Sequence, residues 1–271
     1  MGSLFMTYKD TQKVINFAFA MKRICTMIAA GLLFCACSRA QVKEYGVRVV
    51  KEYPHAADAY TQGLFFHEGV LYETTGQWGA SSIRTVDLSS GMPLQKKTLN
   101  RKYFGEGSVI LNNVLYVLTW TNKVAFLYDP ATLEYRRTVS YPREGWGLTT
   151  DGKELIASDG SATLYFLDPA DLSVRRRLPV RLNGRPLRNL NELEWVRGKI
   201  WANVYLTDMI VVIDPATGEV EATVDCKDLL PAALRTRETD VLNGIAADAD
   251  GKIYLTGKNW PRLYQVELVR R

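Results

Sequence analysis

From residue 41 to residue 271 the chain is a series of short apolar runs broken by polar turns. Val, Ile, Leu, Tyr and Trp alternate with polar residues, and Gly or Asp-Pro punctuates the runs. A period of two is typical of half-buried strands, and no long stretch keeps a helical period. The best short helical candidate is 228–238. The pattern therefore predicts an all-β domain over 41–271.

Two markers recur in this region at intervals of roughly 40–50 residues. The first is an aspartate turn at Asp87, Asp129, Asp168 and Asp214, with spacings of 42, 39 and 46 residues. The second is an apolar strand found in five copies: "LYETTG" (71–76), "LYVLTW" (115–120), "LIASDG" (155–160), "IWANVY" (200–205) and "IYLTGK" (253–258). Five copies of three or four strands each predict a five-bladed β-propeller.

The two ends of the region complement one another. The last copy stops after "RLYQVEL" (262–268) without an outer strand, and "YGVRVVKEY" (45–53) is a strand without a copy of its own. We expect these two segments to pair and close the ring, since an open edge leaves backbone groups unpaired. The Asp-Pro turns are ordinary turn chemistry, so we expect their aspartates to be structural.

Residues 1–37 resemble an export signal. From Met21, "MKRICTMIAAGLLFCACS" joins a basic start to a short apolar run and small residues before Cys37. The run is too short to span a bilayer. The segment predicts a bacterial lipoprotein signal with Cys37 as the lipidated residue, plain secretion being the alternative, and leaves the start of the protein open between Met1 and Met21. We expect a periplasmic or membrane-anchored protein that meets the membrane only through Cys37.

Charge argues against nucleic acid as a partner. The net charge is +5, but residues 1–37 contribute +3 of it. The remaining net charge of +2 is too small to indicate a nucleic-acid-binding surface. We expect the "RRR" run at 175–177 to lie on the solvent-exposed face of a strand.

Cysteine and histidine use is sparse. Cys25 and Cys35 would leave with the signal, so Cys226 stands alone, and we expect it to be a buried apolar residue. Two histidines cannot form a His-rich zinc site. We expect His67 to be solvated in a turn and His55 to form hydrogen bonds within a loop.

One position of the repeat is polar or aromatic in every copy. At the start of the innermost strands stand Gln62, Glu106, Trp146, Asn191 and Asn243, four of them directly before glycine. A hairpin places the ends of the second strands beside them: Gly76, Trp120, Gly160, Tyr205 and Lys258. Both rings face one end of a central channel, opposite the Asp-Pro turns, and could wrap a small polar ligand.

Glu106 is the only carboxylate in these two rings. Aromatic neighbours would desolvate it and raise its pKa toward neutrality, where it can both accept and donate a proton. Its neighbours Gly105 and Gly107 have no Cβ atom, and we expect this to allow close packing of the backbone around them. The alternative is a water-filled polar channel without chemistry.

The motifs resemble those of the plant-latex-type glutaminyl-peptide cyclotransferases and their bacterial relatives. The resemblance runs in order from about 50 to 268 through "YTQGLFF", "FGEGSVIL", "YPREGWGLTTDG", "LNELEW", "VLNGIAAD" and "LTGKNWPRLYQVEL". It implies a five-bladed propeller that is unrelated to the zinc-dependent animal enzymes. The implied reaction cyclises the N-terminal glutamine of a peptide or protein to pyroglutamate and releases ammonia.

The resemblance also assigns roles to residues. Glu106 would take the proton from the α-ammonium group and return one to the leaving ammonia, while Asn191 and Lys258 would bind the substrate amide or stabilise the oxyanion. The remaining residues expected to bind substrate are Gln62, Phe104, Trp120, Trp146, Tyr205 and Asn243.

Three positions depart from the family pattern. Tyr205 stands where plant relatives usually have Trp, Tyr60 where Phe is usual, and Ala56 where an acidic residue follows the histidine. The chemistry needs no metal or cofactor; some relatives hold a structural calcium, and the sequence leaves its presence here open. We expect a monomer.

Two other functions stay open at this point. A calcium-dependent lactonase or related propeller hydrolase could use Glu106, Asn191 and Asn243 as oxygen ligands, although such propellers usually have six blades. A non-catalytic lipoprotein module could present the channel face to a peptide or glycan.

Overall fold

The structure, a computed structural model, describes residues 41–271, and Val42–Arg271 form one compact unit. The predicted signal over 1–37, with Cys37, lies outside the described residues. Within 41–271, no helix has the length and apolar character needed to cross a membrane.

The described chain is built from strands, as predicted. Three four-stranded sheets follow one another along the chain. The first contains β2 (Thr61–His67), β3 (Val70–Thr75), β4 (Ser82–Val86) and β5 (Pro93–Thr98). The second contains β6 (Gly105–Leu111), β7 (Val114–Thr119), β8 (Val124–Tyr128) and β9 (Tyr135–Ser140). The third contains β10 (Leu148–Thr150), β11 (Leu155–Ala157), β12 (Thr163–Leu167) and β13 (Val174–Pro179).

The rest of the unit forms an eight-stranded sheet and a small hairpin. In spatial order the large sheet runs β16 (Leu190–Val196), β17 (Lys199–Val204), β18 (Met209–Ile213), β19 (Val220–Asp225), β1 (Lys43–Pro54), β22 (Arg262–Arg270), β21 (Ile253–Gly257) and β20 (Leu242–Ala247). The hairpin pairs β14 (Arg181–Leu182) with β15 (Arg185–Pro186). Within the short helical candidate 228–238, the structure forms a single 3-10 turn, Ala232–Leu234.

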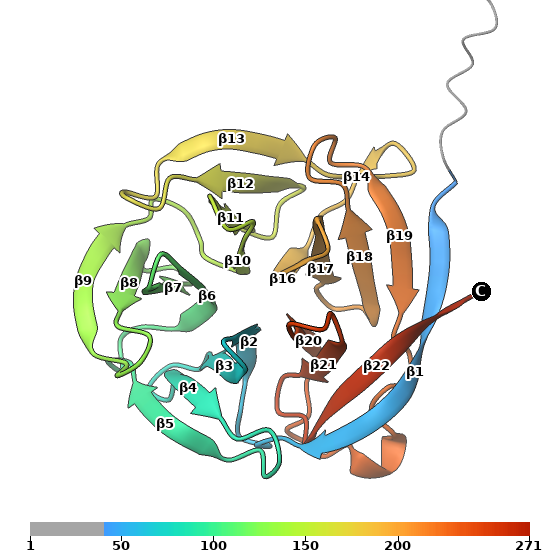
Figure 1. Cartoon of the computed structure of the whole chain (residues 1–271), viewed down its shortest axis with the longest axis horizontal. Coiled ribbons are helices and arrows are strands. Elements are labelled where there is room, and N and C mark those ends of the chain that lie inside the picture. The colour runs from blue at the N-terminus through green and yellow to red at the C-terminus, as the bar shows by residue number, and fades with distance from the viewer. Residues whose placement is uncertain (1–40) are drawn as a thin grey trace, which may run out of the picture. The chain divides into compact units, whose positions relative to one another are not determined.

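The sheets surround a common centre, with β2, β6, β10, β16 and β20 innermost (Figure 1). The predicted pairing of the chain ends is confirmed, because β1 runs antiparallel to β22 from Tyr45–Arg270 to Pro54–Arg262. The first residues of β1 also pair in parallel with β19, from Lys43–Ala222 to Gly46–Asp225. That second pairing was not expected, and it joins two four-stranded groups into one sheet.

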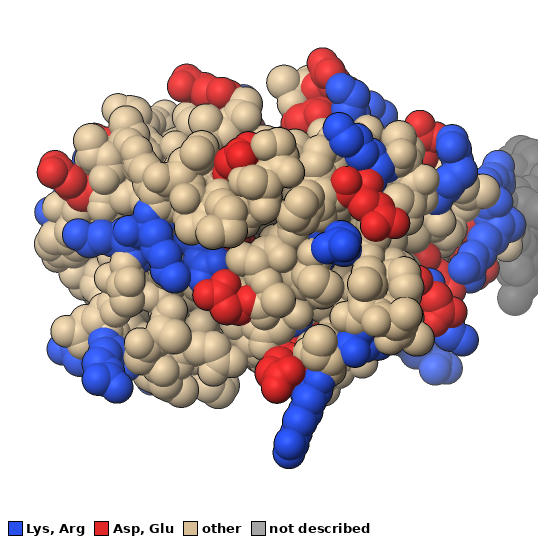
Figure 2. All heavy atoms as spheres, turned by 90° about the horizontal axis from the view of Figure 1, so that it is seen from below, with Lys and Arg blue, Asp and Glu red and all other residues tan. Residues whose placement is uncertain are grey.

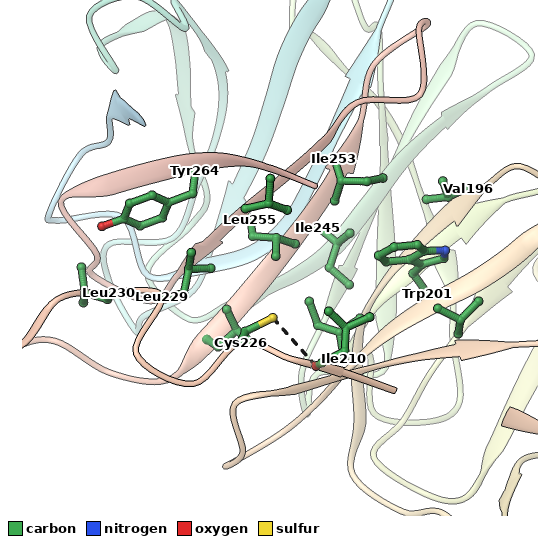
Figure 3. Close-up of a cluster of buried hydrophobic side chains, with 14 of the residues drawn as sticks. Val196, Trp201, Ile210, Cys226, Leu229, Leu230, Ile245, Ile253, Leu255 and Tyr264 are labelled. Carbon is green, nitrogen blue, oxygen red and sulfur yellow. Dashed lines mark hydrogen bonds between the residues drawn. The ribbon is translucent and has the colours of Figure 1, made fainter. Parts of the chain in front are cut away.

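Apolar side chains fill the spaces between neighbouring sheets. A further cluster lies between the two four-stranded groups of the eight-stranded sheet, and Figure 3 shows Cys226 there near Ile210, Leu229 and Leu230. Cys226 is buried, and burial raises the pKa of its thiol to about 12. The prediction of a buried apolar cysteine is confirmed.

Each Asp-Pro turn connects the third and the outermost strand of one four-stranded group, as the Asp129 turn does between β8 and β9. In one such turn an Asp129 carboxylate oxygen accepts the Ala131 and Thr132 N–H groups, at 2.9 and 3.1 Å. Side chains of the preceding sheet reach the turn carbonyls, as when Arg137 Nη2 donates to Ala170 O at 2.9 Å. These aspartates are structural, as predicted.

The arginine run at 175–177 lies exposed on β13, which confirms a solvated strand face. Arg175 pairs with Asp168 at 2.6 Å, and the Arg176 guanidinium stacks 3.6 Å from the centre of the Phe166 ring. Figure 2 shows basic and acidic side chains mixed with one another and with neutral surface on one side of the molecule.

Candidate active site

The innermost strands carry a bulge at four of the five predicted ring positions. The pairing register with the second strand shifts between Thr61 and Gly63, between Gly105 and Ser108, between Leu190 and Leu193, and between Leu242 and Ile245. A bulge inserts one unpaired residue and turns its side chain out of the regular alternation. Gln62, Glu106, Asn191 and Asn243 fall inside these four bulges.

Glycines beside the bulges let the innermost strands pack closely. A Cβ on Gly63 would lie 2.7 Å from Ser108 N, and one on Gly107 would lie 2.5 Å from Leu148 N. A Cβ on Gly147 would lie 2.1 Å from Asn191 O. The interpretation of Gly107 as clearance is therefore confirmed, and the same reason holds for its counterparts.

In β16 the residue at the position of Gly63, Gly107 and Gly147 is Glu192, and it has a different role. Its carboxylate is buried and accepts the Leu64 N–H at 3.2 Å and the Ile245 N–H at 2.9 Å. Burial raises the pKa of this carboxyl well above its ordinary value. Glu192 thus joins three innermost strands, β2, β16 and β20, at the centre of the ring.

A cavity of about 250 Å³ opens among the innermost strands and the loops that follow the second strands. Eight of the nine predicted site residues line it, together with two that were not predicted. The lining residues are Tyr60, Gln62, Gln77, Phe104, Glu106, Trp120, Trp146, Asn191, Tyr205 and Lys258.

Asn243 is the predicted site residue that does not line the cavity. It is fully buried, and its Nδ2 donates to Thr61 O at 2.9 Å and to Gln62 Oε1 at 3.3 Å. Asn243 lies behind Gln62, and this position does not support the direct contact with substrate that we expected. The repeat predicted the position of Asn243 along the strand, but it did not predict how deeply the side chain is buried.

Two predicted ring positions are occupied by glycine for steric reasons. A Cβ on Gly76 would lie 2.2 Å from the Phe104 ring, and one on Gly160 would lie 2.7 Å from the Trp146 ring. These glycines make room for the aromatic walls.

Glu106 is nearly enclosed, with 4% of its surface exposed. Its Oε1 accepts one hydrogen bond, from Gln62 Nε2 at 3.1 Å. Burial raises the pKa of this carboxyl well above its ordinary value; the Lys258 charge opposes the rise and the Glu144 charge adds to it. A raised pKa suits a group that exchanges protons near neutrality.

Lys258 is the buried cation of the cavity. Its Nζ lies 4.8 Å from the centre of the Tyr60 ring and 5.0 Å from that of Tyr205, and forms no hydrogen bond with the described residues. Burial lowers its pKa, while Glu106 and Asp240 act in the opposite sense. The Tyr60 hydroxyl, which the Phe usual at this position lacks, donates a hydrogen bond to Asp240 Oδ2 at 2.7 Å.

The tryptophan walls are held by a residue that sequence reasoning missed. Glu144 Oε2 accepts the indole N–H of Trp120 at 3.0 Å and that of Trp146 at 3.2 Å. The Trp146 ring meets Tyr205 edge-on, with centroids 5.5 Å apart. The only signal in the sequence was the place of Glu144 two residues before a ring position, which does not distinguish it from a solvated acid.

Histidine and acidic residues do not gather into a metal site in the part of the chain that the structure describes: it contains no group of three or more His, Cys, Asp or Glu placed to hold an ion. His55 is a buried hydrogen-bonding residue, with Nε2 2.9 Å from Glu73 Oε1 and Nδ1 2.6 Å from Trp260 O. The expected role of His55 is confirmed.

The fold and the site together define an all-β ring protein with an aromatic-walled cavity that encloses one carboxylate and one amine. Comparison with known proteins gives the family. The family model for glutamine cyclotransferase matches residues 22–268. The chain is 41% identical over 227 residues to a glutaminyl-peptide cyclotransferase of Arabidopsis thaliana, covering 82% of this chain and 71% of that protein.

A solved structure agrees with this match. The glutaminyl cyclase of Myxococcus xanthus superposes with a TM-score of 0.80 at 36% identity, covering 85% of this chain and all of that chain. The chain belongs to the glutamine cyclotransferase family, which confirms the resemblance drawn from its motifs.

Proposed function

We propose that the protein is a glutaminyl-peptide cyclotransferase, which converts the N-terminal glutamine of a peptide or protein to pyroglutamate with release of ammonia. One observation carries the proposal beyond family membership. The cavity places a carboxylate of raised pKa, Glu106, in the same enclosed space as two donors without hydrogen-bond partners among the described residues, the Asn191 amide and the Lys258 ammonium. Those are the groups that an internal aminolysis needs.

In the proposed reaction Glu106 moves protons. It takes a proton from the substrate α-ammonium group, and the resulting amine forms a bond to the side-chain amide carbon. The carboxyl proton then passes to the amide nitrogen, which leaves as ammonia when its bond to carbon breaks. The ring nitrogen loses one further proton, so the products are the lactam and ammonium.

The other cavity residues orient the substrate and stabilise charge. Asn191 and Lys258 would donate to the amide oxygen as it becomes an oxyanion. Gln62, held from behind by Asn243, would orient Glu106, and Phe104, Trp120, Trp146 and Tyr205 would enclose the glutamine side chain. Because amine and amide belong to one residue, holding the chain folded supplies much of the acceleration.

For the same protein we propose a five-bladed propeller, export as a lipoprotein through Cys37, and a monomer that needs no metal for its chemistry. The grouping of strands in fours supports the blade number. The export proposal rests on the sequence of residues 21–37 alone.

The test is a turnover assay on two peptides that differ only in N-terminal glutamine or glutamate, with product mass and ammonia as readouts. We expect a loss of ammonia from the glutamine peptide, unchanged after EDTA treatment. Activity abolished by EDTA and restored by calcium would favour a calcium-dependent enzyme. Tight binding without product would favour a peptide-binding module.

A further inference from the structure

The turn between β3 and β4 borders the cavity and carries two unusual features. Gln77 has a φ of 105°, which residues other than glycine rarely adopt, and Trp78 leaves 51% of its surface exposed. The Gln77 carbonyl accepts the Ala80 N–H at 3.1 Å and, from Ser81, both the N–H at 3.0 Å and the hydroxyl at 2.8 Å. Strained backbone that its surroundings hold in place is concentrated at functional sites.

Trp78 extends the aromatic wall of the cavity toward solvent. Its ring centre lies 5.6 Å from that of Phe104 and 6.4 Å from that of Trp120, and both of these residues line the cavity. Trp120 is itself 36% exposed. The two indoles therefore form an apolar surface that continues from the cavity to the outside, where a large aromatic side chain gains most from being covered.

The same turn offers unpaired polar groups. Gln77 lines the cavity, and its side-chain amide forms no hydrogen bond with any described residue. The Trp78 indole N–H is also free among the described residues, whereas the indoles of Trp120 and Trp146 are both bound to Glu144.

This inference rests on the proposed function. If the cavity encloses the first residue of a peptide, the chain must leave through the exposed part of the lining, which is where Gln77 and Trp120 lie. We propose that Trp78 and Trp120 form a subsite for the side chain of the second residue, favouring aromatic and large apolar side chains. Gln77 then bonds the peptide group between the first and second residues.

The test compares three substrates: a peptide beginning Gln-Phe, the same peptide beginning Gln-Gly, and glutaminamide, which has no second residue. Trp78→Ala should lower kcat/KM for the Gln-Phe peptide about three- to tenfold, the range of one aromatic contact, and leave glutaminamide within about twofold. Trp78→Phe should retain most of the Gln-Phe activity. Tyr135→Ala, which removes an equally exposed aromatic on β9, should change none of the three.

Gln77→Gly tests the second part, because glycine adopts a φ of 105° without strain. It should raise KM for all three substrates with little change in kcat. Equal losses on all three substrates in Trp78→Ala, or no loss on any, would overturn the subsite.

A binding experiment separates this inference from the proposed function. Calorimetry of the Gln-Phe and Gln-Gly peptides uses Glu106→Gln protein, with and without Trp78→Ala. If the unaltered protein turns over no glutaminyl substrate, the proposed function is overturned, while selective weakening of Gln-Phe binding still supports the subsite. Equal weakening of both peptides, or none, overturns the subsite whatever the turnover result.

Discussion

Gly147→Ala should disturb both the stability of the ring and its chemistry. The added Cβ would lie 2.1 Å from Asn191 O and 2.9 Å from the Glu192 Cα, where ordinary contact begins at 3.4 Å. Both neighbours are backbone of an innermost strand, so relief requires moving that strand by more than an ångström. Overpacking of this kind costs about 3 kcal/mol, the upper end of its usual range.

For a domain of this size each kcal/mol shifts Tm by about 2–4 °C, so we expect a loss of about 6–12 °C. Because Asn191 lines the cavity, kcat/KM should fall about tenfold or more, as a displacement of one ångström in a positioning group can cost about a hundredfold. Gly46→Ala is the matched control, since its Cβ would meet only the flexible Arg271 side chain, at 3.1 Å. Thermal unfolding that differs by less than about 2 °C between the two variants would refute the packing argument.

Three further predictions test the electrostatics and support of the site. Glu144→Gln removes a negative charge that raises the Glu106 pKa, so the acid limb of kcat/KM should move to lower pH; an unmoved limb contradicts this. Glu73→Gln removes the partner of buried His55 and should lower the free energy of unfolding by about 3–5 kcal/mol. The His55 pKa is raised above 6.5, chiefly by Glu73 against burial, so the stability from this pair is complete below that pH and lost as pH rises through the raised pKa. Denaturant titrations from about pH 6 to about pH 9 should show that decline in the unaltered protein and not in the variant. Asn243→Ala should lower kcat/KM about three- to tenfold through the amide that it supports, and an unchanged value would show that the support is dispensable.

The repeat made much of the fold predictable from sequence. Alternating apolar positions and regular turns gave the strands, and the unmatched segments at 45–53 and 262–268 gave their pairing. The parallel pairing of β1 with β19 left no comparable signal, because backbone hydrogen bonds along a strand edge do not depend on a particular side chain. At 228–238, the best short helical candidate, the structure forms only the 3-10 turn Ala232–Leu234, which follows Pro231.

Site residues could be predicted where their position in the repeat decides that they reach the cavity. They could not be predicted where burial depth or the conformation of a loop decides it. Glu106, Asn191 and Lys258 meet because their positions in the repeat place them at one end of the ring. Asn243 shares that position but lies a layer deeper. Gln77 enters the cavity through a backbone conformation that its sequence does not favour.

The central claim, that Glu106 carries the proton in a cyclisation of N-terminal glutamine, is tested most directly by Glu106→Gln. This change keeps the shape of the side chain and removes its ability to exchange a proton. The measurement is ammonia and pyroglutamyl-peptide formation from a glutamine-initiated peptide, with thermal unfolding as the check on folding. We predict turnover at least about 100-fold below that of the unaltered protein at similar Tm. Turnover within about tenfold in a folded variant would contradict the account.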